Sequence, residues 1–214
     1  MNAFADLFLV FVVLTNLILL GSSRLRATIW VLASQGVAVG FLSLVVAEDG
    51  LTLLLILIAA VNVSLKGFVI PKLLLRSLRS ANVRHEVEPF VGFSASVILG
   101  VLALIGSMWL TSGLSFHKGP STSLGLPVCL STILIGLLLI VSRRQALMQV
   151  VGYLTMENGI YGLGLMVVGE QPLVVELGVL LDVFVAVFVM GIAMFHISQE
   201  FDHIDVHKMN ELKG

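Results

Sequence analysis

The chain has 214 residues, of which 58% are hydrophobic and 12% charged, with a mean hydropathy of +1.08 and a net charge of −1. Soluble domains carry roughly 25% charged residues, and a soluble fold of this length cannot hide so much apolar surface from water. The near-neutral charge leaves no basic face for nucleic acid. The single cysteine, Cys129, excludes a disulfide framework and a cysteine-ligated zinc or iron–sulfur centre.

Long apolar runs separated by short polar breaks predict an all-α, polytopic membrane protein with about seven transmembrane helices. Each spanning helix needs roughly 20 apolar residues, and lipid tolerates little backbone that is not helical. In chain order the predicted helices are 2–21, 26–47, 51–75, 90–111, 124–141, 145–169 and 172–197. The first run carries Asp6 where a signal peptide would be positive, so we expect it to be retained.

The positive charges predict the orientation of these helices, because cytoplasmic loops of membrane proteins are enriched in lysine and arginine. With seven helices, ten basic residues fall on one side of the membrane: Arg24, Arg26, Lys72, Arg76, Arg79, Arg84, Arg143, Arg144, Lys208 and Lys213. The other side receives only Lys118. The C-terminus is therefore predicted to be cytoplasmic and the N-terminus to lie outside.

Three ionisable side chains lie inside predicted helices: Lys66 in the third, Glu157 in the sixth and Asp182 in the seventh. At a rise of 1.5 Å per residue, each lies roughly 15–18 Å from an end of its helix, near the bilayer midplane. A charge there costs at least about 2.5–3.5 kcal/mol, so these side chains should face other helices or water and pair with one another. Burial disfavours the charged forms of carboxyls and amines, so both types can exchange protons. We therefore predict a proton relay.

Polar neighbours support this interpretation. Asn62 lies four residues before Lys66, Asn158 follows Glu157, and Tyr161 lies one helical turn beyond it. These side chains can hydrogen-bond the charged groups or hold bridging water. Four glycines near Glu157 favour close helix packing over a hinge: Gly152, Gly159, Gly162 and Gly164. Pro71 is predicted to weaken the helix next to Lys66.

Other readings of these residues stay open. A single buried charge can be a structural pair that fixes helix packing, although three in one short chain argue against that. Glu176 is either an interfacial carboxylate or a proton entry group, and His196 is either a histidine favoured by the helix dipole or a proton exit group. His203 and His207 have metal-like spacing but lack further ligands, so no metal site is predicted.

The segments YLTMENG, ELGVLLDVFVAVFVMG and HIDVHKMNELKG resemble component E of hydrogenase-4, a membrane subunit of formate hydrogenlyase-type complexes. The most specific pieces are the MENG motif at Met156–Gly159 and the closing Leu212–Gly214. The resemblance covers most of the chain, including the third helix with Lys66 followed by Pro71.

The last three predicted helices also resemble the K subunit of respiratory complex I and the C subunit of Mrp-type antiporters. That subunit has three helices, with a carboxylate in each of its second and third. Glu157 and Asp182 take those places, but the K subunit has glutamate at the second position. The resemblance implies an N-terminal four-helix membrane bundle at 1–111, a K-subunit-like unit at 112–197 and a cytoplasmic tail at 198–214.

The resemblance implies a membrane-arm subunit of a hydrogenase-4-like or complex I-like redox-driven ion pump in a prokaryotic inner membrane. Such a subunit has no cofactor and no redox chemistry of its own. Its implied partners are antiporter-like membrane subunits, a hydrogenase- or dehydrogenase-like redox module, and lipid. A purely structural scaffold between those modules and a stand-alone transporter are the alternatives, and the lack of an inverted repeat argues against the transporter. Proton and sodium coupling both stay open.

Overall fold

The computed structural model describes residues 2–46, 53–80, 89–113 and 123–167. They form α1 (Asn2–Gly21), α2 (Leu25–Val46), α3 (Leu53–Ser64), the π-helical turn η1 (Leu65–Val69), α4 (Ile70–Ser80), α5 (Phe93–Thr111), α6 (Gly125–Ser142) and α7 (Ala146–Val167). The predicted all-α class is confirmed for this part of the chain. The predicted helix at 172–197, with Glu176, Asp182 and His196, and the tail at 198–214 lie outside the described residues.

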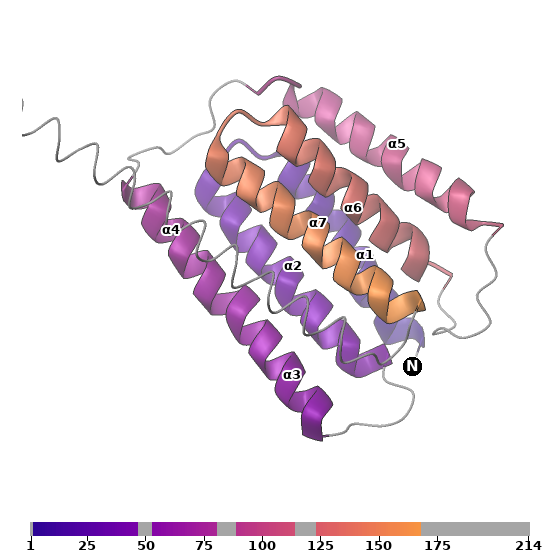
Figure 1. Ribbon diagram of the computed structural model, residues 1–214. Helices are drawn as coiled ribbons and strands as arrows, with labels where there is room; N and C mark the ends of the chain where they lie inside the picture. Colours follow the sequence, from indigo (N-terminus) through magenta and orange to yellow (C-terminus); the bar gives the residue numbers. More distant parts are fainter. Residues whose placement is uncertain (1, 47–52, 81–88, 114–122, 168–214) are drawn as a thin grey trace, which may run out of the picture.

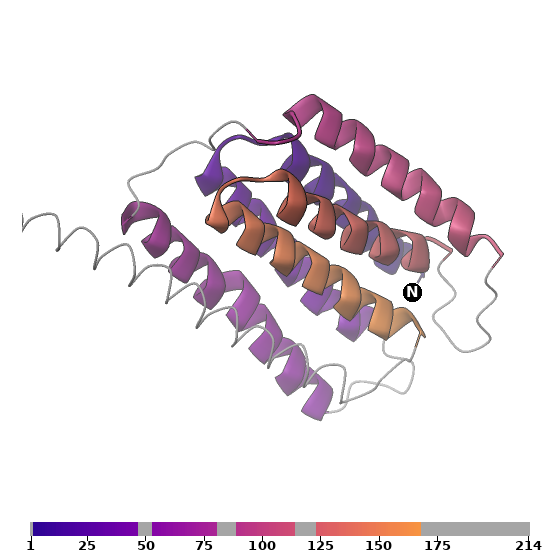
Figure 2. The ribbon, with the colours of Figure 1, turned by 45° about the horizontal axis from the view of Figure 1, so that its top comes forward.

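The helices lie side by side in one bundle (Figures 1 and 2). α5 forms one edge and packs against α1 and α6, which contact each other. α2 and α7 follow in the next layer, and the continuous rod of α3, η1 and α4 packs on α2 at the opposite edge. Contacts therefore join residues from both predicted parts, 1–111 and 112–197, and the division into those parts stays a prediction.

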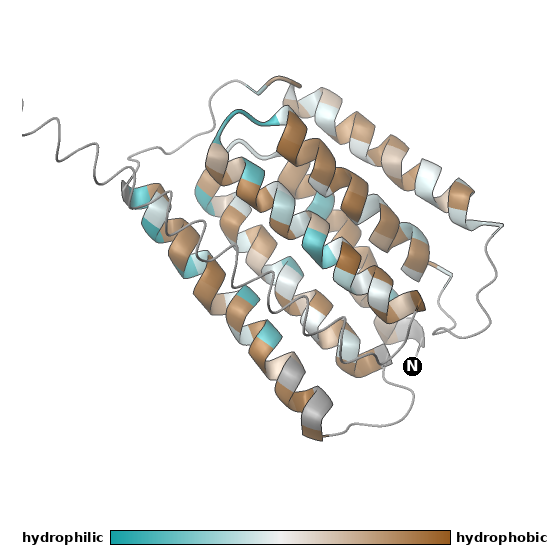
Figure 3. Cartoon of the chain, in the orientation of Figure 1, coloured by the Kyte–Doolittle hydropathy of each residue, from teal (hydrophilic) through white to brown (hydrophobic). Residues whose placement is uncertain are grey.

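Four of the described helices have the length and apolar composition needed to cross a membrane: Phe4–Gly21, Leu25–Val45, Phe93–Thr111 and Gly125–Ser142. Hydrophobic residues make up most of their length (Figure 3). Many large apolar side chains are exposed on these helices, whereas Asn16, Gln35 and Thr132 are buried. The chain is a membrane protein on this pattern. Seven spans and the inside–outside orientation stay predictions.

The third predicted helix, 51–75, is longer and less regular than the sequence indicated. It runs as α3, η1 and α4 to Ser80, so the prediction that Arg76–Pro89 is a loop is wrong for its first five residues. The helix continues because Ile70, Leu74 and Leu78 recur every four residues and are buried in the core.

Proline explains the π turn inside this rod. Pro71 has no N–H and cannot donate to the carbonyl of Gly67 four residues earlier. The helical turn just before Pro71 holds one residue more than an α-helical turn. The N–H of Ile70 therefore donates to the carbonyl of Leu65, five residues back. The predicted local weakness of the helix is confirmed, and it lies directly at Lys66.

α6 and α7 approach each other most closely, through glycines. A Cβ atom added at Gly136 would lie 2.4 Å from the backbone nitrogen of Met156, and one at Gly152 would lie 2.8 Å from that of Ile140. Gly159 and Gly162 face α6 in the same way. The prediction that the glycines near Glu157 serve packing is confirmed for these three, Gly152, Gly159 and Gly162. Elsewhere α7 packs against α2, and its Glu157 meets Lys66 of η1.

Two apolar clusters fill the bundle, one in each half of its length. The first contains residues such as Leu20, Leu74 and Leu139, and the second contains residues such as Leu9 and Val128. Along each of α1, α2, α6 and α7, the switch from one cluster to the other falls at a buried polar residue: Asn16, Gln35, Thr132 and the pair Glu157–Asn158. The polar side chains therefore form a layer at mid-depth.

Arg143, in the turn between α6 and α7, is fully buried although the sequence marks it only as a loop charge. Its guanidinium donates to the carbonyl of Leu20 at the end of α1 and stacks 4.6 Å from the ring centre of Phe93. A cation at a helix C-terminus meets unpaired carbonyls and the negative end of the dipole. Arg143 thus joins α1, α5 and α6 at the end of the bundle where most described basic residues lie.

Replacing Arg143 by methionine is expected to lower the free energy of unfolding by about 2 kcal/mol, because a charge-assisted hydrogen bond is worth roughly 1.5–3 kcal/mol. Arg144→Met is the matched control, since Arg144 is exposed and its guanidinium lies 4.5 Å from the centre of the Phe90 ring. Thermal unfolding of the detergent-purified variants measures the difference. Equal melting temperatures for the two variants would refute a structural role for Arg143.

Candidate functional site

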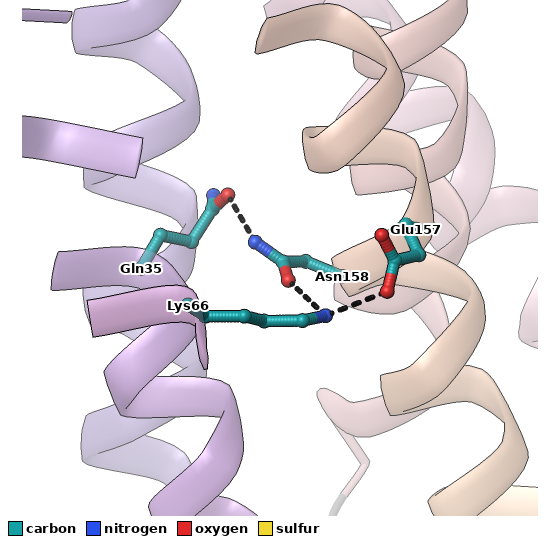
Figure 4. A network of polar contacts seen from close by, with 4 residues as sticks. All are labelled: Gln35, Lys66, Glu157 and Asn158. Carbon is teal, nitrogen blue, oxygen red and sulfur yellow. Dashed lines mark hydrogen bonds and ion pairs between the residues drawn. The ribbon is translucent and has the colours of Figure 1, made fainter. Parts of the chain in front are cut away.

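Lys66 and Glu157 form an ion pair in the middle of the bundle (Figure 4). The Lys66 Nζ lies 2.9 Å from the Glu157 Oε1, and the two side chains are 6% and 2% exposed. Lys66 comes from η1, in the rod at one edge of the bundle, and Glu157 comes from α7, so the pair joins two elements whose residues are 91 positions apart in sequence. Pairing of this kind is what makes two buried charges tolerable in a dry interior.

Two further residues of α7 surround the same ammonium group. The Lys66 Nζ donates a hydrogen bond of 2.9 Å to the Asn158 Oδ1. It also lies 5.7 Å from the ring centre of Tyr161, within range of a cation–π contact. One face of α7 therefore supplies a carboxylate, an amide oxygen and an aromatic ring to a single cation.

Close helix packing brings Lys66 to this position. A Cβ atom at Gly36 of α2 would lie 2.8 Å from the Lys66 Cβ, and one at Gly67 would lie 2.9 Å from the Val37 Cγ2. The lysine stem therefore crosses α2 where α2 has no side chain. The π turn carries the same residue, so its wider backbone and the glycine together aim the ammonium at α7.

A chain of buried amides and hydroxyls continues from Asn158 across the bundle. The Asn158 Nδ2 donates to the Gln35 Oε1 at 3.2 Å (Figure 4). The Gln35 Nε2 donates to Thr15 at 3.0 Å and to the Asn16 Oδ1 at 2.8 Å. The Asn16 Nδ2 donates to the Thr132 Oγ1 at 2.8 Å. Five elements, η1, α7, α2, α1 and α6, thus share one polar network.

The predicted supporting residues differ in what they contact. Asn158 bonds Lys66 directly, whereas Tyr161 approaches it through its ring. Asn62 is buried one turn from Lys66, but no residue in the part of the chain that the structure describes hydrogen-bonds its Oδ1. The same holds, within that part, for the Glu157 Oε2 and the Tyr161 hydroxyl. The site is thus incompletely satisfied on its Glu157 side.

A small pocket adjoins the pair. It has a volume of about 10 Å³ and lies among Lys66, Asn158, Leu32, Ile70 and Leu154, with two further lining residues. That is about the room that one water molecule needs. The part of the chain that the structure describes contains no group of three His, Cys, Asp or Glu side chains placed to hold a metal ion.

The sequence interpretation missed Gln35, Asn16 and Thr132. Asn16 and Gln35 are the only amide side chains in the apolar windows of α1 and α2, and each lies near the middle of its helix. An isolated amide inside a spanning segment is costly when unpaired, and that was the available signal.

The fold and the site define a helical membrane protein with a charged pair buried at mid-depth. No protein-family model and no solved structure matches the chain. It is 28% identical over 202 residues to the uncharacterized protein Rv0085 of Mycobacterium tuberculosis, covering 94% of this chain and 92% of that protein.

The chain is also similar to hydrogenase-4 component E of Escherichia coli. The identity is 27% over 149 residues, which covers 70% of this chain and 69% of that protein. The Shigella flexneri component E matches to the same extent. The chain is therefore a distant homologue of hydrogenase-4 component E, as its motifs indicated.

Proposed function

We propose that this protein is a membrane subunit of a multi-subunit redox complex of the hydrogenase-4 or complex I type, and that Lys66 and Glu157 relay protons within it. The homology to hydrogenase-4 component E supports membership of such a complex. The observation that carries the relay is the buried ion pair, 2.9 Å between the Lys66 Nζ and the Glu157 Oε1.

The pair has the chemistry that proton exchange needs. Both groups take up and release a proton, and direct contact lets the charge of one respond to the other. Among the described residues, none hydrogen-bonds the buried Glu157 Oε2 or the buried Tyr161 hydroxyl. A purely structural ion pair is usually fully satisfied, because an unpaired buried polar atom costs about 1–3 kcal/mol. Open bonding capacity beside a carboxylate favours exchange with water or another titratable group.

Asp182 is proposed as a further relay group, on its predicted position near the bilayer midplane and on the resemblance to the K subunit. Glu176 and His196 are proposed as entry and exit groups on their predicted positions near the two ends of the last helix. The proposed partners are antiporter-like subunits and a hydrogenase- or dehydrogenase-like module in a prokaryotic inner membrane. Protons and sodium ions both remain within this proposal, since carboxylates serve either ion.

Replacing Glu157 by glutamine in the assembled complex is expected to reduce ion translocation per electron by about tenfold or more, with electron transfer retained. Glutamine keeps the size and polarity of the side chain but cannot exchange a proton, and positioned acid–base groups contribute about 10²–10⁴-fold to proton transfer. The measurement is the ion gradient in sealed vesicles against the rate of substrate oxidation.

Asp6→Asn is the control. Asp6 is the other carboxylate in the described part of the chain, and this variant replaces a carboxylate by an amide outside the site. It should leave the number of ions translocated per electron unchanged. Normal translocation in Glu157→Gln would refute the relay. A low yield of complex whose intact fraction translocates normally would instead favour the scaffold.

A further inference from the structure

We propose that Gln35 is a positioning residue that holds the Asn158 oxygen against Lys66, and that the amide chain behind it orients the relay pair without conducting protons. The proposal rests on the relay function proposed above. It concerns a residue of α2 that accepts a hydrogen bond from Asn158, which in turn accepts one from Lys66, so that Gln35 acts on the charged pair through Asn158 (Figure 4).

The direction of every hydrogen bond in the chain is set at its far end. The hydroxyl of Thr132 donates to the backbone carbonyl of Val128 at 2.7 Å, so its oxygen is left to accept. It accepts from the Asn16 Nδ2, which turns the Asn16 Oδ1 toward Gln35. A backbone carbonyl never donates, so this polarity cannot reverse.

A second backbone carbonyl fixes the same amide. The Thr15 hydroxyl donates to the carbonyl of Val12 at 2.8 Å, so its oxygen accepts from the Gln35 Nε2. With both Thr15 and Asn16 as acceptors, the nitrogen of Gln35 is committed and its Oε1 must point to Asn158. The Asn158 Nδ2 then donates to Gln35, which presents the Asn158 Oδ1 to Lys66.

The consequence is electrostatic. An asparagine turned the other way would present its NH₂ group to the ammonium, and two donors repel. In the observed orientation both the Asn158 oxygen and the Glu157 carboxylate face the ammonium as acceptors. Neutral amides have no proton to release near neutral pH, so the chain from Gln35 to Thr132 sets geometry and does not extend the relay toward α6.

Two substitutions of Gln35 separate positioning from packing. Gln35→Met keeps the shape and suits an apolar interior, but it removes the acceptor that orients Asn158. Gln35→Glu, as a neutral carboxylic acid, keeps both: its carbonyl oxygen accepts from Asn158, and its O–H donates toward Thr15 or Asn16. A packing role favours Gln35→Met over Gln35→Glu, whereas the positioning role predicts the reverse order.

The experiment uses the assembled complex in membranes, with two measurements on each variant. The first is ions translocated per electron, and the second is the infrared band of the Glu157 carboxyl group, identified by its loss in Glu157→Gln. We expect Gln35→Met to lower the ratio severalfold and to shift the band, and Gln35→Glu to match the parent protein in both. Gln149→Met makes the same chemical change at an exposed position of α7, where the amide donates to the Arg143 carbonyl at the end of the bundle and not to the site, and it should alter neither.

An unshifted band in Gln35→Met, or a larger loss in Gln35→Glu than in Gln35→Met, would overturn the positioning role. The infrared measurement does not depend on translocation. If Glu157→Gln itself translocates normally, the proposed relay fails while the band still decides whether Gln35 orients Asn158.

Discussion

Replacing Lys66 by methionine is expected to destabilise the protein by about 3–5 kcal/mol, because it leaves the Glu157 carboxylate buried without its partner. Glu157 is 2% exposed and has one oxygen that already lacks a hydrogen bond, so nothing else in the described site neutralises it. Adding Glu157→Gln to Lys66→Met removes the orphaned charge. The double variant should therefore recover much of the stability that Lys66→Met loses.

Thermal unfolding of the parent, both single variants and the double variant, all in one detergent, gives the coupling between the two residues. We expect the cycle to be strongly non-additive, as it is for side chains in direct contact. Lys66→Met combined with Asp6→Asn is the control cycle, since Asp6 lies near the start of α1 and should add independently. Additive losses in the Lys66–Glu157 cycle would mean that the pair contributes nothing as a pair.

Replacing Gly136 by alanine is expected to cost about 3 kcal/mol or more. Overpacking a core usually costs about 1–3 kcal/mol when side chains can repack. Here the new Cβ would lie 2.4 Å from the backbone nitrogen of Met156 and 2.7 Å from the carbonyl oxygen of Gly152, and backbone atoms cannot turn aside. α6 and α7 must separate, and the displacement falls next to Glu157, the residue after Met156.

Gly106→Ala in α5 is the matched control for the Gly136 variant, because outside its own helical turn no described residue has an atom within 4 Å of a Cβ added there. It should be neutral or stabilising by up to about 1 kcal/mol, since alanine is the better helix former. Melting temperature measures both changes. A Gly136 variant as stable as the Gly106 variant would show that the two helices do not pack as closely as the structure has them.

The Lys66 and Gly136 variants both affect Glu157, the first through its ion pair and the second through the packing of α7. The glycine contacts of α6 fix the back of α7, while Lys66 approaches its front across Gly36 of α2. A side chain added on either side would change the distance between Lys66 and Glu157. Helix packing and the ion pair are therefore expected to depend on each other in variants that combine the two.

The sequence by itself determined the helices and the unusual residues in them. Apolar runs of about 20 residues mark spanning helices because lipid requires their backbone to bond internally. Lys66 and Glu157 stood out for the same reason, since charges inside such runs are costly and therefore rare. Pro71 indicated a local weakness because its missing N–H follows from covalent structure alone.

Only the tertiary structure decided which residues meet. A spanning helix is apolar on nearly every side, so its pattern does not reveal which face packs on a neighbour, and single-sequence reasoning had no means to join Lys66 to Glu157. It placed Arg143 in a loop without finding its burial against the end of α1, and it passed over Gln35. The contacts of Arg143 and Gln35 depend on the relative height and rotation of several helices. Close backbone contacts, such as that of Gly136 with Met156, determine that height and rotation.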